Sequence, residues 1–154
     1  MGSRWTHLAL HVRKPASSIA FSERFTSLRV VDRHSDASST GMDVAWLSDR
    51  PIDNENTFVL VLQEGTPRAV PNANPQSPLA PLNHLGFALP SREAVDAIAN
   101  EAKQAGLLHF GPTVLNRNAG SLCLIRDPDG HTVEFAHGQS LGKPYREAYS
   151  ATPR

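Results

Sequence analysis

The sequence predicts an α+β protein built from two βαβββ modules. The order strand, helix and three strands occurs twice along the 154 residues. The tetrapeptide His7-Leu8-Ala9-Leu10 is echoed by His84-Leu85-Gly86-Phe87, at a period of about 77 residues, and each opens the first strand of its module. A proline-rich stretch lies between the two copies. These three observations indicate an internal duplication.

The first module is expected over about residues 5–65. Its first strand is the apolar, β-rich segment 7–12, and Pro15 can occupy the first turn of a helix that runs to Phe25. Short β-type runs then alternate with segments rich in Ser, Asp, Asn, Gly and Pro. These runs predict three further strands, at residues 28–32, 42–47 and 57–63.

A linker is expected over about residues 66–81. Proline lacks a backbone N–H and cannot continue a helix or an inner strand. The prolines recur every few residues in this stretch, at Pro67, Pro71, Pro75, Pro78 and Pro81. We therefore interpret the stretch as a connection between the modules.

The second module is expected over about residues 82–138, followed by a tail over 139–154. A strand at 83–89 precedes Ser91, which is a typical N-cap, and Gly106 ends the helix. Three strands follow, at 110–115, 121–126 and 132–137. The last two are joined by Asp127-Pro128-Asp129-Gly130, a strong turn signal, so they should form an antiparallel hairpin. The whole chain is predicted to be a single domain.

The overall charge excludes two classes of partner. Fifteen basic and fifteen acidic side chains cancel, so no long-range field attracts nucleic acid or an anionic membrane. No apolar run approaches the roughly 20 residues that a membrane-spanning helix needs. The single cysteine, Cys123, cannot form an internal disulfide, and no signal-peptide pattern opens the chain. We expect a cytoplasmic protein that acts on a small molecule.

Three side chains are candidate metal ligands. His7 and His84 occupy equivalent positions in the two modules, and Glu134 lies between Val133 and Phe135 in an apolar strand. Side chains alternate across a strand, so Glu134 faces away from its apolar neighbours, either into a cavity or into solvent. Two imidazoles and one carboxylate would suit one divalent ion, Ni, Zn, Mn or Fe, with positions open for a substrate oxygen. The alternative is that both histidines are ordinary strand residues.

The same residues carry a family resemblance. The segments 7–12, 83–89 and 127–135 resemble the opening strands and the terminal turn and strand of the glyoxalase, bleomycin resistance protein and extradiol dioxygenase (vicinal oxygen chelate) superfamily. The resemblance implies that the modules curl into an open, cup-like mixed sheet, with a metal held by His7, His84 and Glu134. It also implies a homodimer.

The chain departs from one branch of that superfamily. Lactoylglutathione lyases carry a glutamate on the fourth strand, as ligand and acid/base, where this chain has Val61. A valine side chain can neither bind a metal ion nor transfer a proton. A set of two histidines and one glutamate is also similar to that of fosfomycin-modifying transferases and extradiol dioxygenases, so the sequence leaves the reaction, and any use of glutathione, open.

Further site residues are predicted from strand parity. Glu134 and His11 are the candidate catalytic residues. His11 shares a strand face with His7 and could act as a proton carrier or hydrogen-bond donor, although a structural role is equally consistent. Val61 and Gln63 share a face that is expected to bind substrate, while Arg117 and Asn118 could bind its anionic end. A polar turn is the alternative for the last two. If Ser121, Cys123 and Ile125 also point into the cup, it is rather apolar.

The leading hypothesis is a metal-dependent enzyme that polarises an oxygen-chelating substrate, of lyase, isomerase or transferase type. One alternative is a metal-free binding protein of bleomycin-resistance type, which would trap a planar drug or metabolite. Another is an Fe(II) extradiol dioxygenase. A structural domain with incidental histidines is a further alternative, favoured if the three candidate ligands lie far apart.

Overall fold

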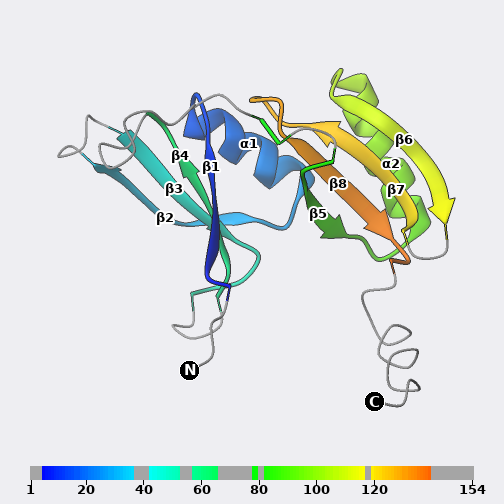
Figure 1. Ribbon diagram of the computed structural model, residues 1–154, viewed down its shortest axis with the longest axis horizontal. Coiled ribbons are helices and arrows are strands. Elements are labelled where there is room, and N and C mark those ends of the chain that lie inside the picture. The colour runs from blue at the N-terminus through cyan, green and yellow to red at the C-terminus, as the bar shows by residue number, and fades with distance from the viewer. Residues whose placement is uncertain are drawn as a thin grey trace, which may run out of the picture. The chain divides into compact units, whose positions relative to one another are not determined.

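The structure is a computed structural model that describes residues 5–36, 42–52, 57–65, 78–79, 82–116 and 119–139. The chain divides into two compact units, Met1–Pro78 and Leu79–Arg154, shown in Figure 1. Within the described ranges, neither helix has the length and apolar character needed to cross a bilayer.

Unit 1 contains one helix and a four-stranded mixed sheet. Its elements are β1 (His7–His11), α1 (Pro15–Phe25), β2 (Arg29–Asp36), β3 (Met42–Ser48) and β4 (Val59–Gln63). The strand order is β1-β4-β3-β2, with β1 parallel to β4 and the other neighbours antiparallel. The strand β2 extends four residues beyond the predicted Asp32 because its polar end pairs with β3 as far as Met42.

Unit 2 repeats this arrangement. Its elements are β5 (His84–Ala88), α2 (Arg92–Gln104), β6 (Leu108–Asn116), β7 (Gly120–Arg126) and β8 (Thr132–His137). The strand order is β5-β8-β7-β6, with β5 parallel to β8 and the remaining pairs antiparallel. The predicted α+β class, with two βαβββ modules and open mixed sheets, is confirmed.

The strand registers show which residues are equivalent in the two units. In unit 1, Ala9 on β1 pairs with Val61 on β4. In unit 2, the corresponding pair is Gly86 on β5 and Glu134 on β8. Val61 therefore occupies the position in unit 1 that Glu134 occupies in unit 2.

Helix α1 covers one side of the first sheet. It begins at Pro15, whose fixed φ suits the first turn, and Phe21 and Phe25 are buried with their ring centroids 5.1 Å apart. Every second residue of the strands points toward α1, and these side chains are buried with it in the core: Leu10, Ala45, Leu47, Leu60 and Leu62. The intervening strand residues, which include His7, point to the side of the sheet that α1 does not cover, called here the open side.

Helix α2 covers the second sheet in the same way. The Ala94 N–H donates to Ser91 Oγ at 3.2 Å, which confirms the predicted N-cap. The Cys123 thiol lies 3.9 Å from the Val95 carbonyl oxygen of α2. Because Leu124 pairs with Glu134, the alternation of side chains puts Ser121, Cys123 and Ile125 on the helix side, away from Glu134. These three side chains, whose direction strand parity alone left open, therefore do not line the open side.

The turn between β7 and β8 has the predicted form. Asp127 Oδ1 accepts from the backbone N–H groups of Asp129 and His131, at 2.9 and 2.7 Å, and Gly130 has a φ of +88°. Burial raises the pKa of the Asp127 carboxyl, and the neighbouring His131 opposes this rise. The two strands pair antiparallel from Arg126 and Thr132, so the predicted hairpin is confirmed.

The end of the expected linker is bound to unit 2. The Leu79 N–H donates to His131 Nδ1 at 2.9 Å, and the Thr132 N–H donates to the Leu79 carbonyl at 3.1 Å. His131 is buried, and no sequence pattern assigned it a role. This histidine therefore helps to hold the chain against the start of β8.

Candidate functional site

The carboxylate of Glu134 lies in the middle of β8 on the open side of the second sheet. Its neighbours Val133 and Phe135 are buried on the helix side, as strand alternation requires. Glu134 is nevertheless only 7% exposed. Its Oε2 atom lies 3.5 Å from Nε2 of His84, which is on the adjacent strand β5. The structure thus brings together two of the predicted ligands.

The second oxygen of this carboxylate has a different partner. Gln139 Nε2 donates to Glu134 Oε1 at 2.6 Å. The prediction had assigned Gln139 to a C-terminal tail, of which only this residue lies in the described part of the chain. Gly138, with a φ of +79°, turns the chain directly after β8. The glycine was a visible signal for a turn, but nothing in the sequence indicated which side chain the turn would bring back.

The third predicted ligand, His7, lies in unit 1. Its Nδ1 atom is 3.0 Å from the hydroxyl of Thr6. His7 is exposed and lines a cavity of about 520 Å³ on the open side of the first sheet. The cavity is lined by residues of three strands and of the segments beside them: Thr6, His7, Ala9, Val44, Trp46, Ile52, Thr57, Val59, Val61 and Gln63.

The cavity is mainly apolar, and its volume is within the range of small-molecule sites. Trp46, Val61 and Ala9 form a continuous row across β3, β4 and β1. Trp46 is 37% exposed, so part of its ring is accessible. The predicted substrate-binding residues Val61 and Gln63 both line the cavity. His11 pairs with Gln63 at the end of β1 but is not among the lining residues.

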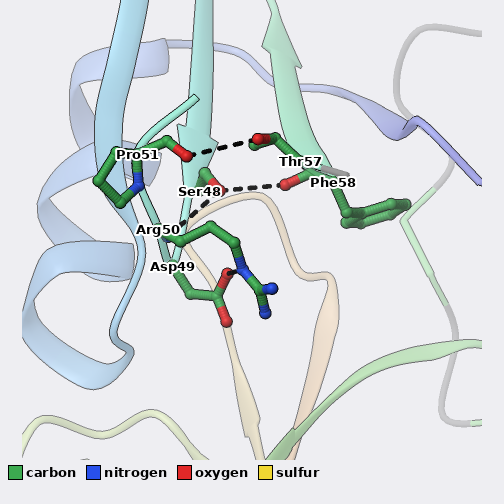
Figure 2. A network of polar contacts seen from close by, with 6 residues as sticks. All are labelled: Ser48, Asp49, Arg50, Pro51, Thr57 and Phe58. Atoms are coloured by element: carbon green, nitrogen blue, oxygen red, sulfur yellow. Dashed lines mark hydrogen bonds and ion pairs between the residues drawn. The ribbon is translucent and has the colours of Figure 1, made fainter. Parts of the chain in front are cut away.

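A polar network lies at one end of the first sheet, between the end of β3 and the start of β4 (Figure 2). The Ser48 hydroxyl donates to the Phe58 carbonyl at 3.1 Å and accepts from the Arg50 N–H at 3.3 Å. The Thr57 hydroxyl donates to the Pro51 carbonyl at 3.4 Å. These bonds tie together the two chain segments that carry Ile52 and Thr57 into the lining of the cavity.

The donor types fit a divalent metal. His84 and Glu134 place an imidazole nitrogen and a carboxylate oxygen side by side, and both are common ligands of Mn, Fe, Ni and Zn. Within the ranges that the structure describes, no three His, Cys, Asp or Glu side chains gather in one cluster. His7 belongs to unit 1 and the other two to unit 2. The predicted residues Arg117 and Asn118 lie outside the described residues.

The repeated βαβββ topology and the two open sheets define a protein built from paired βαβββ modules. A family comparison identifies it: residues 4–135 match the model of the Glyoxalase/Bleomycin resistance protein/Dioxygenase superfamily. The chain belongs to this superfamily. It is also 36% identical over 142 residues to the uncharacterized protein PA2024 of Pseudomonas aeruginosa, covering 92% of this chain and 94% of that protein.

Solved structures share the fold. A possible glyoxalase from Bacillus cereus is 24% identical, with a TM-score of 0.61, and the match covers 88% of this chain and 99% of that one. A mutant of the fosfomycin resistance protein FosX from Listeria monocytogenes is 17% identical, with a TM-score of 0.64 and coverage of 96% and 99%. The trypanothione-dependent glyoxalase I of Leishmania major is 14% identical, with a TM-score of 0.65 and coverage of 97% and 94%.

Proposed function

We propose that the protein is a metal-dependent enzyme that polarises an oxygen-chelating small-molecule substrate, in a lyase, isomerase or transferase reaction. The observation that carries this proposal is the contact between His84 Nε2 and Glu134 Oε2, 3.5 Å apart. A carboxylate that is almost fully buried is costly to keep ionised without a compensating charge. A cation shared with the imidazole supplies that charge.

In this proposal His7, His84 and Glu134 hold one divalent ion, Ni, Zn, Mn or Fe. A bound ion of this kind acts as a Lewis acid that draws charge from a substrate oxygen. The contact with Thr6 suits His7 as a metal ligand. When Nδ1 carries the proton and donates a hydrogen bond to the Thr6 hydroxyl, Nε2 is the ligating nitrogen. The structure of FosX with Mn(II) and 1S,2S-dihydroxypropylphosphonic acid supports a divalent metal and an oxygen-rich ligand on this fold.

The substrate would place an apolar or aromatic part in the cavity of unit 1. Val61 contributes apolar surface there, and Gln63 offers an amide that can donate or accept one hydrogen bond. Arg117 and Asn118 are proposed to bind an anionic end of the substrate. His11 and Glu134 are proposed as the catalytic residues, with His11 as a proton carrier.

We further propose that the two units act as a single glyoxalase-like domain in a cytoplasmic homodimer. The division of the proposed ligands between unit 1 and unit 2 supports joint action, because neither unit carries the full set. Light scattering at tens of micromolar protein tests the assembly. A mass of one chain would contradict the dimer.

Elemental analysis of untagged protein, purified without chelator, tests the metal site. The parent is expected to hold one metal ion per chain, and His7→Ala, His84→Ala and Glu134→Gln are each expected to lose this ion. The matched control is His109→Ala, an exposed histidine on β6 that is not a proposed ligand. Retention of full metal content by any of the three ligand variants would contradict the proposed set.

A second candidate function is a metal-free binding protein of bleomycin-resistance type. The apolar cavity in unit 1 favours it, since that cavity can bind a planar molecule without any ion. A parent that is isolated empty and cannot be loaded with Ni(II), Zn(II), Mn(II) or Fe(II) would favour this function over the first. Oxygen uptake with a catechol and Fe(II) would instead indicate extradiol dioxygenase activity.

A further inference from the structure

The two oxygens of the Glu134 carboxylate have different surroundings. Oε1 accepts a hydrogen bond of 2.6 Å from Gln139, and Oε2 lies 3.5 Å from His84. We infer that Gln139 is a positioning residue that fixes the carboxylate so that Oε2 alone is presented to a metal shared with His84. This inference rests on the proposed function, because it assigns Glu134 as a ligand.

The backbone after β8 makes this contact possible. Five residues of extended chain would carry residue 139 roughly 16 Å beyond residue 134, on the opposite face of the sheet. Gly138 instead has a φ of +79°, which turns the chain back, and no atom lies within 4 Å of a Cβ built there. The turn is anchored from one side, because His137 Nδ1 lies 3.0 Å from the carbonyl oxygen of Leu89.

The chemistry of an amide suits this position. A glutamine N–H can satisfy a carboxylate oxygen without bringing a positive charge that would repel a cation at the other oxygen. A lysine or arginine at residue 139 would neutralise the carboxylate and compete with the metal. Hydrogen bonds to ligating carboxylates typically account for about 10- to 100-fold in metal affinity.

The bond could instead serve only to satisfy a buried acceptor, and metal binding separates the two roles. The dissociation constant for Co(II) is measured by competition with a chelator, on the full-length protein, together with the visible spectrum of the bound ion. Gln139→Ala is expected to weaken Co(II) binding by about 10- to 100-fold and to alter the spectrum. Gln104→Ala, an exposed glutamine at the end of α2, is the matched control and should match the parent.

A second variant acts through the backbone. Gly138→Ala keeps the amide but penalises the positive φ, so it should weaken Co(II) binding in the same direction as Gln139→Ala and by a smaller factor. If Gln139→Ala binds Co(II) with the parent's affinity and spectrum while Glu134→Gln loses it, the inference is overturned and the proposed function stands. If the parent binds neither Co(II) nor any of Ni(II), Zn(II), Mn(II) and Fe(II), or if Glu134→Gln binds Co(II) unchanged, both are overturned.

Discussion

The open sides of the two sheets differ, although the sheets share one topology and one register. In unit 1 the central row across β3, β4 and β1 is Trp46, Val61 and Ala9. In unit 2 the equivalent row is Leu124, Glu134 and Gly86. One row offers an aromatic surface beside a cavity, and the other offers a buried carboxylate beside a histidine. The two units therefore share one scaffold, while their open sides carry different side chains.

The neighbouring rows, shifted by one residue along each strand, face the helices, and they do not differ in this way between the two units. Leu62 lies between Ala45 and Leu10 in unit 1, and Phe135 lies between Cys123 and Phe87 in unit 2. Both central residues are almost completely buried. These rows perform the same task of forming a core with the helix.

The largest effect is expected from truncating these core residues. Phe135→Ala should lower the free energy of unfolding by about 3–5 kcal/mol, and Leu62→Ala by about 2–5 kcal/mol, because each leaves a cavity under a helix. Equilibrium denaturation in urea measures both. Phe58→Ala, in which the ring is 43% exposed, is the matched control and should cost much less. A small effect at only one of the two core positions would show that the helix-facing rows are not equivalent.

Much of this fold was predictable from the sequence. Pro15 and Ser91 mark the helix starts through their own backbone chemistry, and the Asp127–Gly130 turn is specified within four residues. Strand alternation also separated Glu134 from Val133 and Phe135. These signals are local, so one sequence suffices to interpret them.

The features that the sequence did not predict depend on contacts between segments that are distant along the chain. The direction in which Cys123 points depends on where α2 packs, and parity alone leaves two choices. The contact of Gln139 with Glu134 depends on a turn at Gly138, and the role of His131 depends on Leu79, which is 52 positions away in the chain. No local pattern encodes such partners.

A smaller effect is expected when the row of unit 1 is made more like that of unit 2. Trp46→Leu places in β3 the residue that β7 has at the equivalent position. It should weaken binding of anilinonaphthalene sulfonate, an aromatic anion whose rings bind apolar surfaces, by about threefold to tenfold, since an aromatic contact contributes on the order of 1 kcal/mol. Fluorescence titration measures this change. Trp5→Leu, at a ring that is 83% exposed and outside the cavity, is the control. Equal losses in both variants would place the probe elsewhere.

The reverse comparison concerns Gly86, the counterpart of Ala9. Nothing lies within 4 Å of a Cβ built on Gly86, and its backbone is not in the positive-φ region. Gly86→Ala should therefore raise the free energy of unfolding by about 0.5–1 kcal/mol, because the unfolded chain loses freedom. Gly120→Ala is the contrasting variant: its Cβ would overlap the His137 carbonyl oxygen, and its φ is +68°, so it should destabilise the protein. Destabilisation by Gly86→Ala would mean that this row needs the glycine for packing.

The last effect is confined to alkaline pH and separates Cys123 from its counterpart Ala45. Burial, and then the negative charges of Asp96 and Glu134, raise the pKa of the Cys123 thiol from 9.0 to about 11. Between pH 9 and about 11 the Cys123 thiol therefore stays protonated in the folded protein but loses its proton in the unfolded chain. The thiol's contribution to stability is complete below pH 9 and is lost as the pH rises towards 11. Cys123→Ala removes this titration. Urea denaturation between pH 8 and about 11 should show a steeper loss of stability in the parent than in the variant, because other alkaline titrations are common to both. Parallel curves would mean that the thiol is less desolvated than its burial beneath α2 implies.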